Sequence, residues 1–531
     1  MKKLWISIIL TLPLWLIPTG CEKPDNPGKE EEQKQEQEQK ESQTQEDSEL
    51  KNTYLYVNTF ARNTMNLYYL WNEEIKSALS SWKDTEEPIA KVASIRYHTG
   101  AGSNRVDVDR WTALYDDFKA FENSVSGNEK TYGFDFVIYG YDDESVCAVV
   151  TYTYADSPAR EAGLQRGDVI VKVNGKSLDR AATGSSQLSQ GAVNIIYNEL
   201  LGGDKVELGL LRYDAEKKEY SSKKFTMNSV EMYENPVLLS KVFDCGGKKV
   251  GYLVFTSFTL NACEDLIRVA KEFKAEGVSE LILDLRYNGG GYVITENVLA
   301  SLLAPEAEVL AGSIVSTEVY NAGLTEYFAD RGEDTNTYFE TEFTFNAGKK
   351  NEYTLSTADA NIGITKIYAI IDSGTASASE AILCDLFPYM DITLVGQRSH
   401  GKYCSGVMME GPDFYDDYSD QLDATTVKKG KKYTDNWGLY VMYSRFADKN
   451  GETRCMPNGL APDVKADDDP LDGCQLGDSK ETMLAVALGL AGYETKAPAA
   501  RKADRERLPI ERVEGIDPFR PEFGMRIKTL K

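Results

Sequence analysis

The feature that most constrains the fold of this chain is a short apolar segment that runs into a turn of small residues and then into a helix. Residues 366–372 (KIYAIID) are apolar and rich in β-branched side chains, which favours a buried strand. Gly374 permits a tight turn, and residues 379–387 (SEAILCDLF) have helical spacing that ends before Pro388. A strand, turn and helix in this order place the turn at the end of a sheet and direct the free amides of the helix N-terminus toward it.

Two residues in and after this turn are candidates for chemistry. Ser377 lies within residues 372–380 (DSGTASASE), and we interpret it as a nucleophile. Lys402 follows a second predicted strand, residues 392–396, and we interpret it as the general base. A lysine amine accepts a proton only if burial has lowered its pKa, so this interpretation requires an apolar pocket. The alternative is a small-residue turn before a helix and an ordinary surface lysine.

A glycine-rich turn lies upstream of these residues. Residues 281–291 (LILDLRYNGGG) read as a buried strand that runs into three glycines. Glycines let backbone amides come close to a reacting carbonyl, so this turn is a candidate oxyanion site.

Together the three stretches resemble the C-terminal processing peptidases, also described as tail-specific or carboxyl-terminal proteases. That family carries an Asp-Leu-Arg-x-Asn-x-Gly-Gly turn, a Ser-Ala-Ser-Ala-Ser-Glu motif and a Gly-Lys motif. The resemblance implies that Ser377 is the nucleophile, that Lys402 is its base, and that Gly290 or Gly291 binds the oxyanion together with the amide of Ala378. It also implies the spiral sheet shared with the ClpP and crotonase folds.

The chain departs from the family pattern at one position. The family often has a glutamine four positions after the lysine, where it is thought to orient the amine, and this chain has Gly406 there. Either Ser405 or a residue elsewhere holds the amine, or the activity is weak or lost.

A second resemblance lies in residues 156–175 (DSPAREAGLQRGDVIVKVNG), which look like part of a PDZ domain extending over 129–230. Ser157 and Pro158 predict a helix start, and an Asn-Gly pair predicts a turn after a strand. The resemblance implies a loop whose amides take a peptide carboxylate while the peptide adds as a strand. That loop consists of Tyr132, Gly133, Phe134, Asp135 and Phe136. The alternative is a plain strand start in a domain that serves as a spacer or lid.

The beginning of the chain resembles a bacterial lipoprotein. Residues 1–21 combine two lysines, an apolar run and a small residue before Cys21, which predicts a signal peptide and a lipidated cysteine. The alternative is an ordinary cleavable signal with an incidental cysteine. Residues 22–50 are mostly Glu, Gln, Lys and Ser, which predicts a disordered tether. We therefore expect a lipid-anchored protein of the bacterial cell envelope, on the outer membrane and facing the periplasm or the cell surface.

The remaining patterns predict the domain organisation. Apolar residues at helical spacing predict a small helical N-terminal domain over residues 51–128. Strands that alternate with helices predict right-handed βαβ units, and hence an α/β catalytic domain over 231–492. Residues 493–531 are a C-terminal extension that the sequence leaves unassigned.

Composition limits the classes of partner. A formal net charge of −25 argues against nucleic acid, because phosphate binding needs a basic face. The chain has two histidines, His98 and His400, and no Cys-x-x-Cys pair, so we expect no zinc site and no other cofactor. A triad centred on His400 is a minor alternative, and a half-exposed loop histidine is the favoured interpretation.

The sequence thus predicts a membrane-anchored serine endopeptidase that cleaves extended or unfolded polypeptides, with a PDZ domain that recognises C-terminal tails. The second hypothesis is a catalytically weak or inactive peptide-binding lipoprotein on the same fold.

Overall fold

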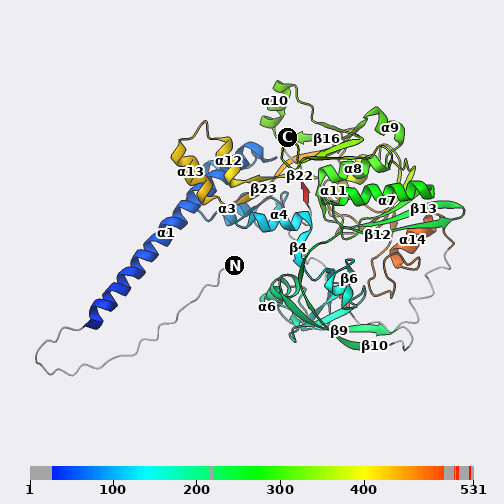
Figure 1. The fold of residues 1–531 in the computed structure, drawn as a ribbon, viewed down its shortest axis with the longest axis horizontal. Helices are drawn as coiled ribbons and strands as arrows, with labels where there is room; N and C mark the ends of the chain where they lie inside the picture. The colour runs from blue at the N-terminus through cyan, green and yellow to red at the C-terminus, as the bar shows by residue number, and fades with distance from the viewer. Residues whose placement is uncertain are drawn as a thin grey trace, which may run out of the picture. The chain divides into compact units, whose positions relative to one another are not determined.

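The structure is a computed structural model, and it describes residues 27–214, 217, 219–494, 508, 510–512 and 525–527. The predicted signal peptide and Cys21 lie outside these residues. The chain divides into two compact units, Met1–Thr53 and Tyr54–Lys531. Figure 1 shows the elements along the chain.

The described part of the first unit is the start of helix α1, which spans Pro27–Tyr68. The structure therefore differs from the disordered tether predicted over residues 22–50. Residues 45–50 are all exposed, so burial of an apolar face does not explain the helix there. Glu, Gln and Lys are strong helix formers, and this propensity explains the difference. Within the described ranges, no helix combines the length and apolar character needed to cross a bilayer.

Residues 237–465 include a six-stranded sheet in which every neighbouring pair of strands after the first pair is parallel. Its first strand pairs antiparallel with the second. In spatial order the strands are β12 (Val237–Cys245), β13 (Lys248–Phe255), β14 (Val278–Asp284), β20 (Lys366–Ile371), β21 (Asp391–Gly396) and β24 (Val464–Lys465).

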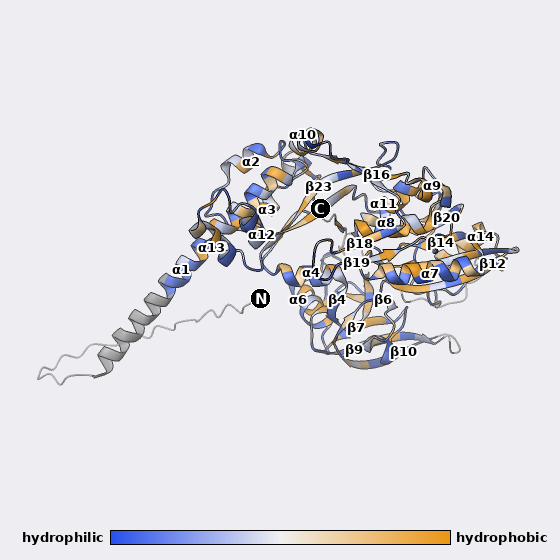
Figure 2. Cartoon of the chain, turned by 45° about the horizontal axis from the view of Figure 1, so that its top comes forward, coloured by the Kyte–Doolittle hydropathy of each residue, from blue (hydrophilic) through white to orange (hydrophobic). Residues whose placement is uncertain are grey.

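Helices cover both faces of this sheet. Leu281 and Leu283 belong to the apolar core with α7 (Ala262–Glu276), α8 (Val293–Leu303) and α11 (Ala378–Leu386). Ile282, between them, belongs to the core on the other face, with α14 (Thr482–Leu490). This alternation follows the two-residue period of a strand. Figure 2 shows hydrophobic residues gathered along β14, β20 and α8. The predicted α/β fold class is confirmed.

A second sheet lies beside the first and carries the described N-terminal elements of the second unit. In spatial order its strands are β15 (Gly290–Tyr292), β26 (Met525–Ile527), β22 (Cys404–Glu410), β23 (Gly438–Asp448), β16 (Ile314–Tyr320) and β17 (Asn336–Tyr338), with β3 (Ala113–Tyr115) on β23. Helices α2 (Lys76–Ser81), α3 (Pro88–Ile95) and α4 (Phe118–Ser126) share one apolar core with β22 and β23.

The region predicted to be helical, residues 51–128, contains helices and also short strands. Ala113–Tyr115 in particular is strand β3. Pairing with the edge of β23 decides the outcome, because aromatic and apolar residues suit either structure.

The predicted PDZ domain is a sheet with two short helices. In spatial order its strands are β10 (Glu219–Asn228), β9 (Lys205–Asp214), β7 (Val169–Val173), β6 (Ser145–Thr153), β5 (Phe134–Gly140) and β25 (Glu511–Arg512). Ser157 caps α5 (Pro158–Glu161), as predicted, by accepting a hydrogen bond from Arg160 N at 3.1 Å. Helix α6 (Gln190–Ile195) follows. A ribbon of β4 (Asn128–Thr131) and β11 (Val230–Tyr233) borders the domain.

The other described elements are short. They are β1 (His98–Thr99), η1 (Gly102–Asn104), β2 (Val106–Asp107), β8 (Leu178–Asp179), η2 (Ile196–Leu201), α9 (Glu306–Ala311), α10 (Ala322–Arg331), β18 (Glu342–Phe345), β19 (Tyr353–Ser356), α12 (Gly411–Asp417) and α13 (Ala424–Tyr433).

Candidate active site

Ser377 lies at the sharp turn between β20 and α11. Its φ of 62° and ψ of −114° are unusual for a residue with a side chain, and such strain is typical of a nucleophile at a strand-to-helix turn. The side chain is buried, and its Oγ has no hydrogen-bond partner among the described residues.

The serine turn is attached to the glycine-rich turn. Ala376 N donates to the carbonyl of Asn288 at 3.1 Å, and Ser379 Oγ donates to the same carbonyl at 3.0 Å. Thr375 Oγ1 donates to the carbonyl of Leu285 at 3.0 Å. Two motifs that are far apart in the sequence thus meet at the ends of neighbouring strands.

The predicted oxyanion residues have different surroundings. The amide of Gly290 donates to Asn288 Oδ1 at 2.9 Å, so it already has an acceptor. Gly291 has a φ of 141°, and a Cβ there would lie 2.5 Å from the carbonyl oxygen of Phe258, so only glycine fits. Ala378 begins α11, where an amide lacks an intrahelical acceptor. The Gly290 amide is therefore engaged within its own turn, and Gly291 and Ala378 remain the candidates for binding an oxyanion.

Lys402 is completely buried, which is the environment that its proposed role requires. Its Nζ donates to Tyr440 Oη at 3.0 Å. The same nitrogen lies 5.5 Å from the ring centroid of Trp111 and 5.1 Å from that of Tyr440. The amine therefore lies in an aromatic pocket with a phenol oxygen as a hydrogen-bond acceptor.

Tyr440 occupies the space beside Gly406, where the family pattern often has glutamine. A Cβ added to Gly406 would lie 2.4 Å from two ring carbons of Tyr440. Ser405, which we considered as the residue that holds the amine, instead directs its Oγ toward Glu318 at 3.3 Å. Tyr440 was missed at the sequence level because nothing in its local pattern distinguishes it from a core aromatic residue.

Glu380 connects the serine helix to the lysine loop. Its Oε2 accepts hydrogen bonds from Ser377 N at 3.1 Å and from Lys402 N at 2.8 Å. Its Oε1 accepts from Gly401 N at 2.7 Å and from Ser399 Oγ at 2.5 Å. Burial raises the pKa of Glu380 to about 7, although these four donors act in the opposite direction. One carboxylate oxygen thus fixes both candidate catalytic residues through their backbones.

His400 does not form a triad with Ser377. Its Nε2 lies 3.5 Å from Arg110 Nη2, and its ring makes an edge contact with Trp111 at 6.2 Å between centroids. The ring is half-buried, in agreement with the interpretation of a loop histidine.

Two protein-family models match this chain. Residues 249–466 match the model of peptidase family S41, and residues 149–190 match a PDZ domain model. The chain contains a peptidase family S41 domain. The sequence-based resemblance is therefore confirmed.

Individual relatives of the S41 domain are distant. The chain is 28% identical over 253 residues to a carboxyl-terminal-processing protease of Synechocystis, covering 47% of this chain and 48% of that protein. It is 25% identical over 297 residues to the carboxy-terminal processing protease CtpB of Bacillus subtilis, covering 56% of this chain and 50% of that one. The chain thus spans about half the length of these curated relatives.

A solved structure supports the fold. A Bacteroides fragilis protein assigned to the S41 proteases superposes with a TM-score of 0.55 at 21% identity, covering 81% of this chain and 96% of that one. At this identity the likeness shows the fold alone.

A buried ionic network lies beneath the glycine-rich turn of the S41 domain. Arg286 is fully buried and makes ion pairs with Asp284, Asp468 and Glu481, each at 2.8 Å. Arg166 of the PDZ domain joins this network through Asp468 at 2.6 Å. Burial alone would raise the pKa of Asp468, but the two guanidinium groups outweigh it and lower this pKa well below its usual range.

The same network reaches the residue before Asn288. Arg166 Nη1 donates to Tyr287 Oη at 2.8 Å, and Tyr287 Oη donates to Asp468. Tyr287 has a φ of 68°, so its backbone is held in the left-handed region. A side chain of the PDZ domain therefore directly contacts the turn that leads to Gly290 and Gly291.

The predicted carboxylate loop of the PDZ domain is partly engaged. The amide of Gly133 donates to Thr131 Oγ1 at 2.9 Å, and the amide of Phe136 donates to Asp135 Oδ1 at 2.8 Å. The carbonyl of Tyr132 accepts from Ala159 N at 2.9 Å, and Phe134 begins strand β5. The structure thus places all five predicted residues at one end of β5, but two of their amides already have acceptors.

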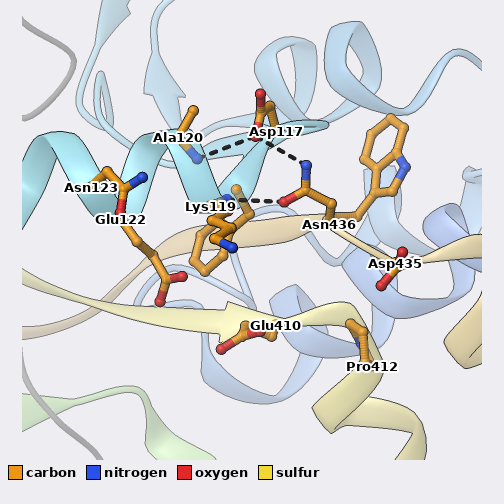
Figure 3. A pocket seen from close by; sticks show the side chains of 11 residues that line it. Asp117, Lys119, Ala120, Glu122, Asn123, Glu410, Pro412, Asp435 and Asn436 are labelled. Carbon is orange, nitrogen blue, oxygen red and sulfur yellow. Dashed lines mark hydrogen bonds between the residues drawn. The ribbon is translucent and has the colours of Figure 1, made fainter. Parts of the chain in front are cut away.

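A pocket of about 670 Å³ lies between the start of α4 and the end of β22 (Figure 3), and none of the predicted site residues lines it. Asp117 accepts hydrogen bonds from Ala120 N and from the side chain of Asn436 there. Burial raises the pKa of Glu122 and of Glu410, which also line the pocket. Neither Ser377 nor Lys402 lines it, so we do not assign it to the catalytic chemistry.

Proposed function

We propose that this chain is a serine endopeptidase in which Ser377 and Lys402 form a catalytic dyad. The observation that carries the proposal is the shared oxygen of Glu380, which holds the backbones of a strained, buried serine and of a fully buried lysine. Burial favours the neutral amine that a general base requires.

The proposed reaction proceeds in two steps. Lys402 accepts the proton of Ser377 Oγ as this oxygen attacks the scissile carbonyl, and the protonated amine then donates to the leaving amine. The amides of Gly291 and Ala378 stabilise the oxyanion. Water then hydrolyses the acyl-enzyme with Lys402 again acting as base. The direct Ser377–Lys402 hydrogen bond is absent in this structure, and we propose that it forms in the substrate complex, where catalytic hydrogen bonds commonly tighten.

The proposed substrates are extended or unfolded polypeptides whose C-terminal tails bind the PDZ domain. An added strand at the edge of β5 is the mode of peptide recognition that this domain suggests. The negative net charge supports polypeptides over nucleic acids as partners. We also propose that Cys21 is lipidated and holds the enzyme at a membrane of the bacterial cell envelope, on the basis of the residues that precede it.

The test is cleavage of an unfolded model protein by the full chain, compared with Ser377→Ala and Lys402→Ala. Loss of cleavage in both variants, with unchanged circular dichroism, is expected. His400→Ala serves as the matched control, because it lies in the same loop as Lys402, and it should retain activity. If the parent binds apolar C-terminal peptides but neither cleaves nor becomes phosphonylated by a fluorophosphonate, the protein is the peptide-binding lipoprotein of the second hypothesis.

A further inference from the structure

A strand from the far end of the chain fills the gap between the two strands that flank the candidate active site. Strand β26 pairs in parallel with β15, so that Gly290 lies opposite Met525 and Gly291 lies opposite Arg526. On its other side β26 pairs with β22, which closely follows Lys402. The edge that carries the candidate oxyanion glycine is therefore already hydrogen-bonded to another strand of the same chain.

The strand is also fixed by a side chain. Ile527 is 2% exposed and belongs to the apolar core that contains Tyr292, Val407 and Tyr440. It lies opposite Tyr292 in the ladder. This edge thus accepts an extended backbone together with a branched aliphatic side chain, which is how an extended peptide substrate would be held.

A nearby segment occupies the PDZ domain in a similar way. Strand β25 pairs antiparallel with β5, with Glu511 opposite Gly140 and Arg512 opposite Tyr139. Leu508 and Ile510 pack against the apolar cluster that contains Tyr139. Addition of an antiparallel strand to this edge is the geometry of a bound PDZ ligand.

The direction of the chain argues against a bound tail substrate. A substrate whose last residues occupy the PDZ edge would offer earlier residues to the active site. Here the segment on the PDZ edge, 511–512, precedes the segment beside Gly290 and Gly291, 525–527. The order of the two segments is therefore the reverse of that expected for a substrate. While they are in place, a substrate strand cannot pair with β15 or with β5.

We propose that the C-terminal extension is an intramolecular peptide ligand that blocks both edges until a polypeptide substrate displaces it. This inference rests on the proposed function, because it assigns β15 and β22 to the substrate site. The displaced ligand has a defined chemistry, namely an extended segment with a β-branched aliphatic residue opposite Tyr292.

The first test measures occupancy without activity. In the full chain carrying Ser377→Ala, amide hydrogen exchange at Gly291, which lies opposite Arg526 in the ladder, should be slow. Ile527→Asp buries a charge in an apolar site and should raise this exchange by at least about tenfold. Ile510→Asp, in the PDZ-bound segment, is a second variant that leaves the core around Ile527 intact and should act in the same direction. Leu310→Asp is the matched control, because Leu310 is 73% exposed and distant in sequence from both edges.

The second test measures cleavage of an unfolded protein by the same variants with Ser377 restored. Ile527→Asp and Ile510→Asp should cleave at least about threefold faster than the parent at low substrate concentration. The reason is that a larger fraction of the molecules has both edges open to substrate. Unchanged exchange at Gly291 would overturn the inference, as would equal cleavage by the active parent and the variants. Faster exchange in chains that all fail to cleave would support docking of the extension and instead refute the proposed peptidase function.

Discussion

The contact between Tyr440 and Lys402 provides the sharpest test of the proposed dyad. Tyr440→Phe removes only the oxygen that accepts a hydrogen bond from Lys402 Nζ at 3.0 Å. Lys402 gains the proton of Ser377 in the transition state, and a hydrogen bond to a charged group contributes about 1.5–3 kcal/mol. Each 1.36 kcal/mol of barrier is a factor of ten in rate. If the bond aligns the amine for proton transfer, kcat should fall by about 10- to 100-fold. KM should change little, because we assign Tyr440 no contact with substrate.

The space beside Gly406 permits a reciprocal experiment. Gly406→Gln alone should destabilise the protein, because its Cβ would lie 2.4 Å from the ring of Tyr440 and overpacking costs about 1–3 kcal/mol. Tyr440→Ala alone should lose activity. The double variant Gly406→Gln/Tyr440→Ala replaces a phenol with an amide in the same space, and it should recover activity relative to Tyr440→Ala.

The assays are steady-state cleavage of an unfolded protein and the rate at which a fluorophosphonate phosphonylates Ser377. Ser405→Ala is the matched control, since the Ser405 side chain is directed toward Glu318, and its activity should stay within about twofold of the parent. Full activity of Tyr440→Phe, or no gain in the double variant over Tyr440→Ala, would refute the role of Tyr440 as the positioning residue.

Further predictions concern the groups around the dyad. Glu380→Gln places one acceptor and one donor where a carboxylate receives four hydrogen bonds. It should lower the free energy of unfolding by about 2 kcal/mol or more, and it should also lower kcat. Unchanged urea melts would contradict this. The folded pKa of Glu380, about 7, lies above its ordinary value of 4.5, so its contribution to stability is complete below pH 4.5 and is lost as pH rises through 7. The stability of the parent relative to Glu380→Gln should therefore fall by up to about 3 kcal/mol over that interval, and parallel pH profiles would argue against the raised pKa. Arg166→Met leaves Asp468 with one guanidinium partner fewer and should lower unfolding free energy by about 3 kcal/mol together with kcat. Arg212→Met, which breaks an ion pair with Asp168 within the PDZ domain, should spare kcat, and an equal loss of kcat in both variants would refute a specific role for Arg166.

Local patterns predicted the elements around the site because those elements are defined by neighbours in the sequence. The apolar run before Gly374 is strand β20, and the helical spacing after Ser377 is helix α11. The role of Tyr440 was not predictable in this way. Its approach to Lys402 depends on the antiparallel pairing of β22 with β23, including a shift of register between Ser405 and Gly406. Such long-range register leaves no local trace in either strand.

The other differences have similar causes. The composition of residues 22–50 indicates the lack of a core, but it does not exclude a helix formed by residues with high propensity. The extension after residue 492 has no periodic pattern, and its strands β25 and β26 are defined by the edges that they join. The raised pKa of Glu380 follows from burial, which outweighs the opposing effect of four donors. Both exist only after the loop at Lys402 has folded over α11.

The placement of Arg166 has a thermodynamic consequence. This guanidinium belongs to the PDZ domain, yet it hydrogen-bonds to the tyrosine that immediately precedes Asn288 in the glycine-rich turn. If a peptide on β5 shifts Arg166, it changes the free energy of the turn that we propose binds the oxyanion. Thermodynamic linkage then requires the two effects to be equal. The factor by which the peptide changes the affinity for a transition-state analogue on Ser377 must also be the factor by which the analogue changes the affinity of the PDZ domain for the peptide. The change in tail affinity and the change in analogue affinity would then both measure a single coupling free energy.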